Sequence, residues 1–210
     1  MSDASYTDFL AQKKTHPTHD GPVVDPGEIH ALLHDWQKDI VRWAVRVGRA
    51  AIFASTGLGK TFMQLEWARL SGGTTLIVAP LAVCHQTIRE AAKLELTVTY
   101  AHDASEITGP GAWISNYERV EKFDPAVFDA VVLDESSILK ASDGKTRTLL
   151  IRHFADVPRR LSCTATPAPN DVEELTSQAA FLGVASRVNM LATWFIHDDE
   201  GWRLKGHARA

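Results

Sequence analysis

The sequence has few cysteines and lacks a long apolar run. Only two cysteines, Cys84 and Cys163, occur among its 210 residues, and they form no CxxC pair. This excludes a disulfide-stapled fold, a zinc ribbon and a dithiol redox site, and it favours reduced thiols in a cytoplasmic protein. The longest mostly apolar stretch, 76–83, is interrupted by Pro80, whereas a membrane-spanning helix needs about 20 apolar residues. Because residues 1–21 also carry no apolar run, we expect neither a secretory signal nor a membrane partner.

An excess of positive charge is also absent. The chain has 22 lysines and arginines against 26 aspartates and glutamates, which gives a formal net charge of −4. A uniformly basic nucleic-acid coat is therefore excluded, and any DNA contact has to come from a local patch. Apolar residues make up 45% of the chain, an ordinary value for a globular protein of one large domain or two small ones.

The order of polar and apolar segments predicts an α/β fold. Residues 1–27 are polar and proline-bearing, which is typical of a flexible arm, and 28–196 alternate between strand and helix patterns. This alternation favours a mostly parallel central sheet with helices on both faces. We expect strands at 49–53, 74–79, 97–100, 112–115, 130–133 and 160–163, and helices at 32–47, 61–70, 81–94, 147–154 and 171–182. In the expected first helix, Trp36 and Trp43 are assigned to the core face, as is Trp67 in the second.

The strongest local signal is the glycine-rich stretch 54–61, which reads ASTGLGKT between a predicted strand and a predicted helix. Its glycines, Gly57 and Gly59, allow backbone N–H groups to curl around an anion at a helix N-terminus. Lys60 is expected to reach the β- and γ-phosphates of a nucleotide, and the Thr61 hydroxyl to ligate Mg²⁺. The backbone around Thr56 and Leu58 completes the expected nucleotide-binding loop. An accidental glycine turn is the alternative, and the strand-to-helix context disfavours it.

A second signal is the acidic pair Asp134 and Glu135, which directly follows the apolar stretch 130–133. Carboxylates at the carboxyl end of a buried strand lie where α/β sheets bind ligands. We expect Asp134 to hold Mg²⁺, and Glu135 to orient and deprotonate an attacking water. An acidic strand end alone is more often a solvated turn, and the phosphate loop upstream is what favours the functional interpretation.

These motifs together resemble the superfamily 2 helicases and translocases, and within them the Swi/Snf-type ATPases. The A-x-x-G-x-G-K-T spelling at 54–61 is the helicase form of the phosphate loop, and DESS at 134–137 is similar to the D-E-x-x (DEAD/DEAH-like) box. The LLHDWQ stretch at 32–37 resembles the motif in which Gln37 would recognise adenine. TATPAPN at 164–170, followed by Glu173-Glu174-Leu175, resembles the T-x-T-P-x-x-N…E-L motif that couples the ATP site to DNA.

The resemblance covers about 32–182 and implies a RecA-like N-terminal lobe that binds ATP and Mg²⁺ and touches the backbone of duplex DNA. Lys60 and Glu135 would then be catalytic, with Gln37, Thr56, Gly57, Leu58, Gly59, Lys60 and Thr61 binding the nucleotide, and Thr61 and Asp134 the metal. Two further motifs, at 80–86 and 114–118, resemble those that line the DNA track. The residues that the resemblance assigns to DNA contact or coupling are Pro80, His85, Asn116, Thr164, Thr166 and Asn170.

Two departures from the family pattern bear on function. The acidic box carries Ser136 and Ser137 where the family commonly has Ala-His or Ala-Asp. In addition, 210 residues leave no room for the second RecA-like lobe, so 197–210 would be an incomplete segment leading toward a lobe supplied in trans or missing by truncation. Because the arginine finger of that lobe is typically worth about 10³–10⁵ in turnover, we expect weak hydrolysis or none by the isolated chain. The alternatives are the motor portion of a restriction or nuclease complex, and a nucleotide- or DNA-binding module without turnover.

Several other candidates carry weaker signals. His30 and His34 have a metal-compatible spacing without a third ligand, so helix-surface histidines are favoured. Trp202 has basic neighbours and is the tryptophan with a plausible exposed role. The segment 140–160 holds six cationic residues against two acidic ones, and a DNA-facing surface and a solvated helix face are about equally supported there.

Overall fold

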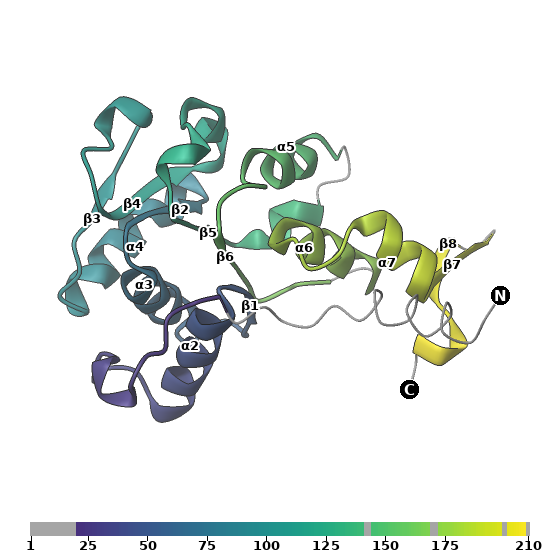
Figure 1. Ribbon diagram of the computed structural model, residues 1–210, viewed down its shortest axis with the longest axis horizontal. Helices are drawn as coiled ribbons and strands as arrows, with labels where there is room; N and C mark the ends of the chain where they lie inside the picture. Colours follow the sequence, from purple (N-terminus) through teal and green to yellow (C-terminus); the bar gives the residue numbers. More distant parts are fainter. Residues whose placement is uncertain (1–19, 141–143, 169–171, 199–200, 209–210) are drawn as a thin grey trace.

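A six-stranded parallel sheet forms the centre of the described part of the chain (Figure 1). The computed structural model describes residues 20–140, 144–168, 172–198 and 201–208. Neighbouring strands follow the order β1-β6-β5-β2-β4-β3, and each neighbouring pair is parallel. The strands are β1 (Arg49–Phe53), β2 (Thr74–Ala79), β3 (Val98–Tyr100), β4 (Gly111–Asn116), β5 (Ala130–Asp134) and β6 (Arg159–Thr164). The predicted α/β class with a parallel central sheet is confirmed.

The middle of the sheet is buried on both faces. All six residues of β2 are buried, as the continuous apolar stretch TTLIVA predicts for a central parallel strand. Side chains alternate between two cores, with Leu76 and Val78 in one and Ile77 and Ala79 in the other. Each face therefore needs its own cover of helices.

The two cores are covered by different helices (Figure 1). One face carries α2 (Asp35–Val47), α3 (Lys60–Ser71) and α4 (Leu81–Lys93), and the other carries α5 (Lys145–His153) and α6 (Leu175–Leu182). Beyond α6 lie α7 (Arg187–Trp194) and an antiparallel hairpin of β7 (Phe195–Asp198) and β8 (Gly201–Leu204). These last elements extend away from the sheet.

The two tryptophans of α2 lie outside its buried face, whereas Ala44 and Val47 are buried as their spacing predicts. Trp36 and Trp43 are 43% and 51% exposed, so their assignment to the core was wrong, whereas Trp67 on α3 is fully buried as predicted. The buried face of α2 carries Gln37, Val41, Ala44, Val45 and Val47. This helical spacing places the polar Gln37 on the buried face of α2, and the bulky tryptophans lie beside that face.

The segments flanking the sheet are described only in part. Residues 20–27 lie on α2, because Gly21 donates its N–H to the Arg46 carbonyl and accepts from the Arg46 guanidinium at 2.9 Å. The remainder of the predicted arm lies outside the described residues, as does Asp171 at the start of the predicted helix 171–182; α6 begins at Leu175. No helix within the described ranges is long and apolar enough to cross a membrane.

Candidate functional site

The sequence motifs meet at the carboxyl edge of the sheet. Five neighbouring strands carry them in spatial order, with the phosphate loop after β1, Thr164 at the end of β6, Asp134 at the end of β5, Pro80 after β2 and Asn116 at the end of β4. The register aligns these ends, since Phe53 pairs with Thr164, and Asp134 pairs with Cys163. Ligands of open α/β sheets bind at this edge, so the fold brings the predicted site residues to one side of the molecule.

The phosphate loop turns from β1 into α3 through two glycines with positive φ. Gly57 has φ 86° and Gly59 has φ 72°, values that L side chains rarely adopt. Gly59 is the N-cap of α3, so the free N–H groups of the first turn of α3 point toward the loop. The Lys60 ammonium donates to the Ala54 carbonyl at 2.8 Å, and the Ala54 N–H donates to the Thr164 carbonyl at 3.3 Å. The loop is thus tied to the neighbouring strand β6.

The Gln37 side chain of α2 packs against the phosphate loop. Its side chain is 4% exposed, its amide nitrogen donates to the Leu58 carbonyl at 3.0 Å, and its amide oxygen accepts from the His34 N–H at 2.8 Å. A methyl group on Gly59 would lie 2.5 Å from that amide nitrogen. Helix α2 and the loop are therefore in close contact at Gln37, and this contact depends on glycine at position 59.

Asp134 is held by three hydrogen bonds. Its Oδ2 accepts from the Gln64 side-chain amide at 2.9 Å, and its Oδ1 accepts from the Glu135 N–H at 3.0 Å. Its own carbonyl accepts from the Tyr117 hydroxyl at 2.6 Å. Gln64 and Tyr117 are fully or nearly fully buried, and Asp134 is 4% exposed. The carboxylate is consequently fixed in orientation by neutral donors.

Burial has a marked effect on the electrostatics of this carboxylate. Desolvation raises the pKa of Asp134, the Gln64 hydrogen bond opposes that rise, and the charge of Glu135 adds to it. The charge of Lys60 acts in the opposite direction and lowers the pKa of Asp134. Burial, and then the negative charge of Asp134, raise the pKa of Tyr117 well above its ordinary value, so the phenol stays a hydrogen-bond donor. A buried carboxylate in this environment is stabilised by a nearby cation.

The residues after Asp134 form a tight turn. Glu135 has φ 50° and is half-buried, and its carbonyl accepts from the Ser137 hydroxyl at 3.5 Å. Ser136 is buried, and its carbonyl accepts from the Gln178 amide of α6 at 3.0 Å. The left-handed backbone at Glu135 is uncommon for a residue with a side chain.

The remaining motif residues lie along the same edge. Thr164 is buried and its hydroxyl accepts from the Thr166 N–H at 3.1 Å, while Asn170 lies outside the described residues. Pro80 is the N-cap of α4, and Asn116 is 5% exposed with a side-chain oxygen that has no partner in the described structure. His85, on the first turns of α4, is exposed and stacks on Tyr100 with ring centroids 6.1 Å apart.

Sequence reasoning missed Gln64 and the role of Tyr117. Gln64 follows Lys60 by one helical turn on α3, and it is one of three buried polar residues, with Glu66 and Ser71, on a helix that also buries Met63 and Trp67. A polar residue at a core position of the helix that follows the phosphate loop was the available signal. Tyr117 lies directly after β4, within a motif already compared with the DNA track.

The weaker candidates have local explanations. Among the described residues, no group of three or more His, Cys, Asp or Glu side chains could hold a metal ion, and His30 accepts from the Leu32 N–H. Cys163 is a buried free thiol, as predicted. Of the basic segment 140–160, Arg160 is buried and donates to the Phe181 carbonyl at 2.6 Å, which removes it from any exposed phosphate-binding surface. Trp202 is partly buried and packs edge-on against His197.

The chemistry of the donor set fits Mg²⁺ carried on a nucleotide better than a dedicated metal cage. Mg²⁺ commonly takes one or two carboxylates together with substrate phosphates and waters. Asp134 supplies a carboxylate at the end of β5, and Thr61 supplies a hydroxyl on the first turn of α3.

The parallel sheet and the placement of the motifs at its carboxyl edge give the fold of a RecA-like helicase-core lobe. The family model of the SNF2-related domain matches residues 29–198. The chain therefore belongs to the SNF2-related domain family and represents a Swi/Snf-type lobe.

Solved structures share this fold at low sequence identity. The SWI2/SNF2 ATPase core of Sulfolobus solfataricus in complex with dsDNA matches with a TM-score of 0.68 and 20% identity, over 82% of this chain and 41% of that one. The UvsW helicase of bacteriophage T4 matches with a TM-score of 0.58 and 15% identity, over 87% of this chain and 66% of that one. The Hef helicase domain of Pyrococcus furiosus matches with a TM-score of 0.59 and 17% identity, over 74% of this chain and 38% of that one.

One curated protein, p41 of Acyrthosiphon pisum secondary endosymbiont phage 1, is 27% identical over 181 residues. The match covers 73% of this chain and 39% of p41. The chain thus spans well under half the length of p41 and of the Sulfolobus core.

Proposed function

We propose that the chain is the ATP-binding lobe of a DNA-dependent ATPase, which hydrolyses ATP to ADP and phosphate when a second RecA-like lobe completes the site. The observation that carries the proposal is the shared carboxyl edge of the sheet, where the phosphate loop lies two strands from the buried Asp134. The charge of Lys60 lowers the pKa of Asp134 against the larger opposing effect of burial, which supports a common site for the two residues. A triphosphate with its divalent cation matches the positive and negative charges of this pair.

The phosphate loop supplies the nucleotide contacts in this proposal. Backbone N–H groups of Gly57 and of residues 59–61 would surround the phosphates, while the Leu58 N–H donates to the Ser55 carbonyl at 3.2 Å. The N-terminal end of α3 adds a favourable dipole. The Lys60 ammonium exchanges its bond to the Ala54 carbonyl for bonds to the β- and γ-phosphate oxygens. Gln37 holds the loop through its hydrogen bond to the Leu58 carbonyl. Adenine recognition by Gln37 stays a prediction.

Hydrolysis in this proposal depends on the acidic turn. Thr61 and Asp134 would hold Mg²⁺, which supplies charge neutralisation on the β- and γ-phosphates. Gln64 and Tyr117 keep Asp134 in place, and Glu135 accepts a proton from the attacking water. Without the arginine finger of a second lobe, turnover is lower by about 10³–10⁵. We therefore expect nucleotide binding by the isolated chain and very slow hydrolysis.

The proposed partner is duplex DNA, contacted through its backbone along the edge that carries Pro80, His85, Asn116, Thr164 and Thr166. The Sulfolobus relative in complex with dsDNA supports this choice. Backbone contacts are indifferent to sequence and weaken as salt rises. The coupling role of Asn170 belongs to the same proposal.

The test is a titration of the chain with a fluorescent ATP analogue in the presence and absence of Mg²⁺. Lys60→Ala should abolish binding, because it removes the only side-chain cation that the proposal places on the phosphates. Lys122→Ala, at an exposed lysine outside the site, is the matched control and should bind as the parent does. Equal affinity of the parent and Lys60→Ala would overturn the proposal.

A further inference from the structure

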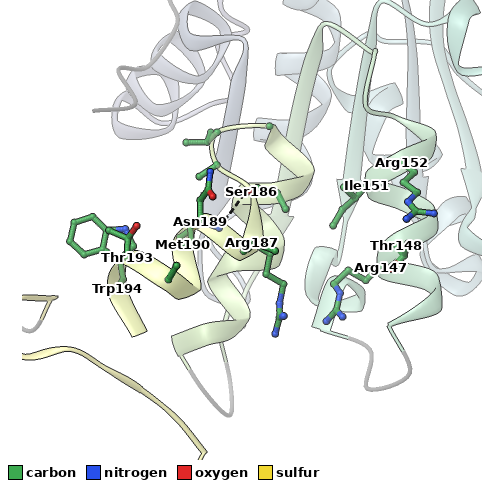
Figure 2. A pocket seen from close by; sticks show the side chains of 16 residues that line it. Arg147, Thr148, Ile151, Arg152, Ser186, Arg187, Asn189, Met190, Thr193 and Trp194 are labelled. Carbon is green, nitrogen blue, oxygen red and sulfur yellow. Dashed lines mark hydrogen bonds between the residues drawn. The ribbon is translucent and has the colours of Figure 1, made fainter. Parts of the chain in front are cut away.

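A cavity near the described C-terminal elements is lined by α5, the end of α6 and α7. It has a volume of about 1100 Å³ and runs between α5 and the segment from the end of α6 through α7. Figure 2 shows Arg147 and Ile151 on α5 on one side of this gap and Arg187 on α7 on the other. None of the residues that the family resemblance assigns to nucleotide, metal or DNA contact lines it, although Arg147 and Arg152 belong to the basic segment 140–160. We call this cavity the α5–α7 groove.

Helix α7 exposes more apolar surface than a solvent-facing helix normally does. Val188 is 74% exposed, Trp194 is 43% exposed, and Val184 just before the helix is 46% exposed. Leu191 is the buried residue of α7, so the helix is apolar on its inner face and on its outer face as well. A helix that is apolar on both sides is typical of an element covered on both sides. The groove side of α7 is therefore suited to apolar contact.

The groove is also cationic. Three arginines line it, and no Asp or Glu is among its described lining residues. Arg187 is held in place by Glu173, with distances of 2.8 and 3.1 Å to the two carboxylate oxygens. Within the described structure, the side chains of Arg147 and Arg152 form no hydrogen bond or ion pair. This concentration of positive charge occurs in a chain whose net charge is −4.

We propose that the α5–α7 groove binds an amphipathic helix of a protein partner, with the apolar face of that helix against α7 and acidic residues beside Arg147 and Arg152. Helices α5 and α7 form the two walls of the groove. Helix-in-groove recognition uses apolar anchors spaced i, i+3, i+4 and i+7, and the charged rim sets orientation and partner choice.

Nucleic acid is the less suitable occupant. A phosphate backbone would satisfy Arg147 and Arg152 but offers no apolar face to cover Val184 and Val188. The groove also contains one aromatic side chain, Trp194, among its described lining residues, so successive bases would find no stacking platform. The apolar surface is what favours a peptide.

The test uses a fluorescein-labelled amphipathic peptide of about 18 residues, with leucines at i, i+3, i+4 and i+7 spacing and glutamates flanking them. A peptide with lysines in place of the glutamates and a short DNA duplex serve as competing probes. Fluorescence anisotropy with the intact chain should show saturable binding of the acidic peptide, weakened by salt, and little binding of the basic one.

Variants then locate the binding surface. Val188→Asp and Arg147→Glu should each weaken the acidic peptide by at least about fivefold. Val23→Asp and Arg89→Glu are the matched controls, at an exposed valine and an exposed arginine outside the groove, and should leave affinity unchanged. Circular dichroism of each variant checks that the fold is retained. Absence of binding, equal effects of groove and control variants, or preference for the basic peptide or the duplex would each overturn the proposal.

Discussion

The contact between Gly59 and Gln37 makes a quantitative prediction that requires no ligand. Gly57 and Gly59 both have positive φ, so an alanine at either position should cost about 1–2 kcal/mol of backbone strain. At Gly57 a Cβ would meet no atom within 4 Å, whereas at Gly59 it would lie 2.5 Å from the Gln37 amide nitrogen. That amide is buried and bonded at both ends, to Leu58 and to His34, so it cannot move without losing a hydrogen bond. Loss of that hydrogen bond should destabilise Gly59→Ala by a further amount of about 1–3 kcal/mol and should not affect Gly57→Ala.

Urea unfolding of Gly59→Ala and Gly57→Ala, followed by circular dichroism without nucleotide, measures the difference directly. We expect Gly59→Ala to lower the free energy of unfolding by at least about 1 kcal/mol more than Gly57→Ala does. A third variant, Gln37→Ala, should reduce the gap between the two glycine sites, because it removes the atoms that the new methyl group meets. Equal destabilisation by the two alanines, in the presence of Gln37, would refute the structural role assigned to this contact.

Four further outcomes are expected. Gln64→Met should reduce the enhancement of nucleotide affinity by Mg²⁺ and leave the affinity without Mg²⁺ unchanged. The control is Gln178→Met, at a buried glutamine that donates to the Ser136 carbonyl, and it should alter stability only. Titrations with and without Mg²⁺ separate the two outcomes. Tyr117→Phe should lower the free energy of unfolding by about 1–2 kcal/mol, measured in urea, because the buried Asp134 carbonyl loses its donor. Neither cysteine should react with Ellman's reagent in the native chain at pH 8, and both should react in denaturant, since both thiols are buried. Burial raises the pKa of Cys84 from 9.0 to about 11. Because the thiol ionises at lower pH in the unfolded chain than in the folded chain, the free energy of unfolding should fall as pH rises through that interval. Cys84→Ala should lessen this fall.

The sheet and its carboxyl edge were predictable because their signals are local. Strands such as 74–79 are continuous apolar stretches, and the phosphate loop, the acidic turn and TATP each follow a strand directly in the sequence. Parallel strands align their carboxyl ends, so motifs that follow strands meet at one edge without any knowledge of the tertiary contacts. The predicted bounds differ from the observed ones mainly in the first and last residues of helices.

The misassigned face of α2 shows where local patterns are insufficient. Tryptophan at positions 36 and 43 suggested a core face, but the side chain that packs against the phosphate loop is the polar Gln37. The Gln37 amide is stabilised by hydrogen bonds to Leu58 and His34, and Leu58 belongs to a loop 21 residues away in sequence. No helical periodicity within α2 contains that information.

Gln64 and the C-terminal elements were missed for related reasons. A glutamine on a helix is ordinarily exposed, and only the approach of β5 converts Gln64 into the donor to Asp134. In α7, apolar residues occupy positions on both faces, so no single amphipathic period is visible. Strands β7 and β8 have only four residues each, and the polar sequence around them resembles an ordinary solvated loop.

We propose that the carboxyl edge couples nucleotide binding to DNA binding, and mutual enhancement of binding tests this coupling most directly. The measurement is the dissociation constant of a fluorescent ATP analogue with Mg²⁺, in the absence and presence of saturating duplex DNA, together with the converse titration of labelled duplex. We expect the ATP analogue and the duplex each to raise the affinity of the chain for the other by the same factor, because coupling free energy is reciprocal. Two independent affinities, with neither ligand altering the other, would contradict it.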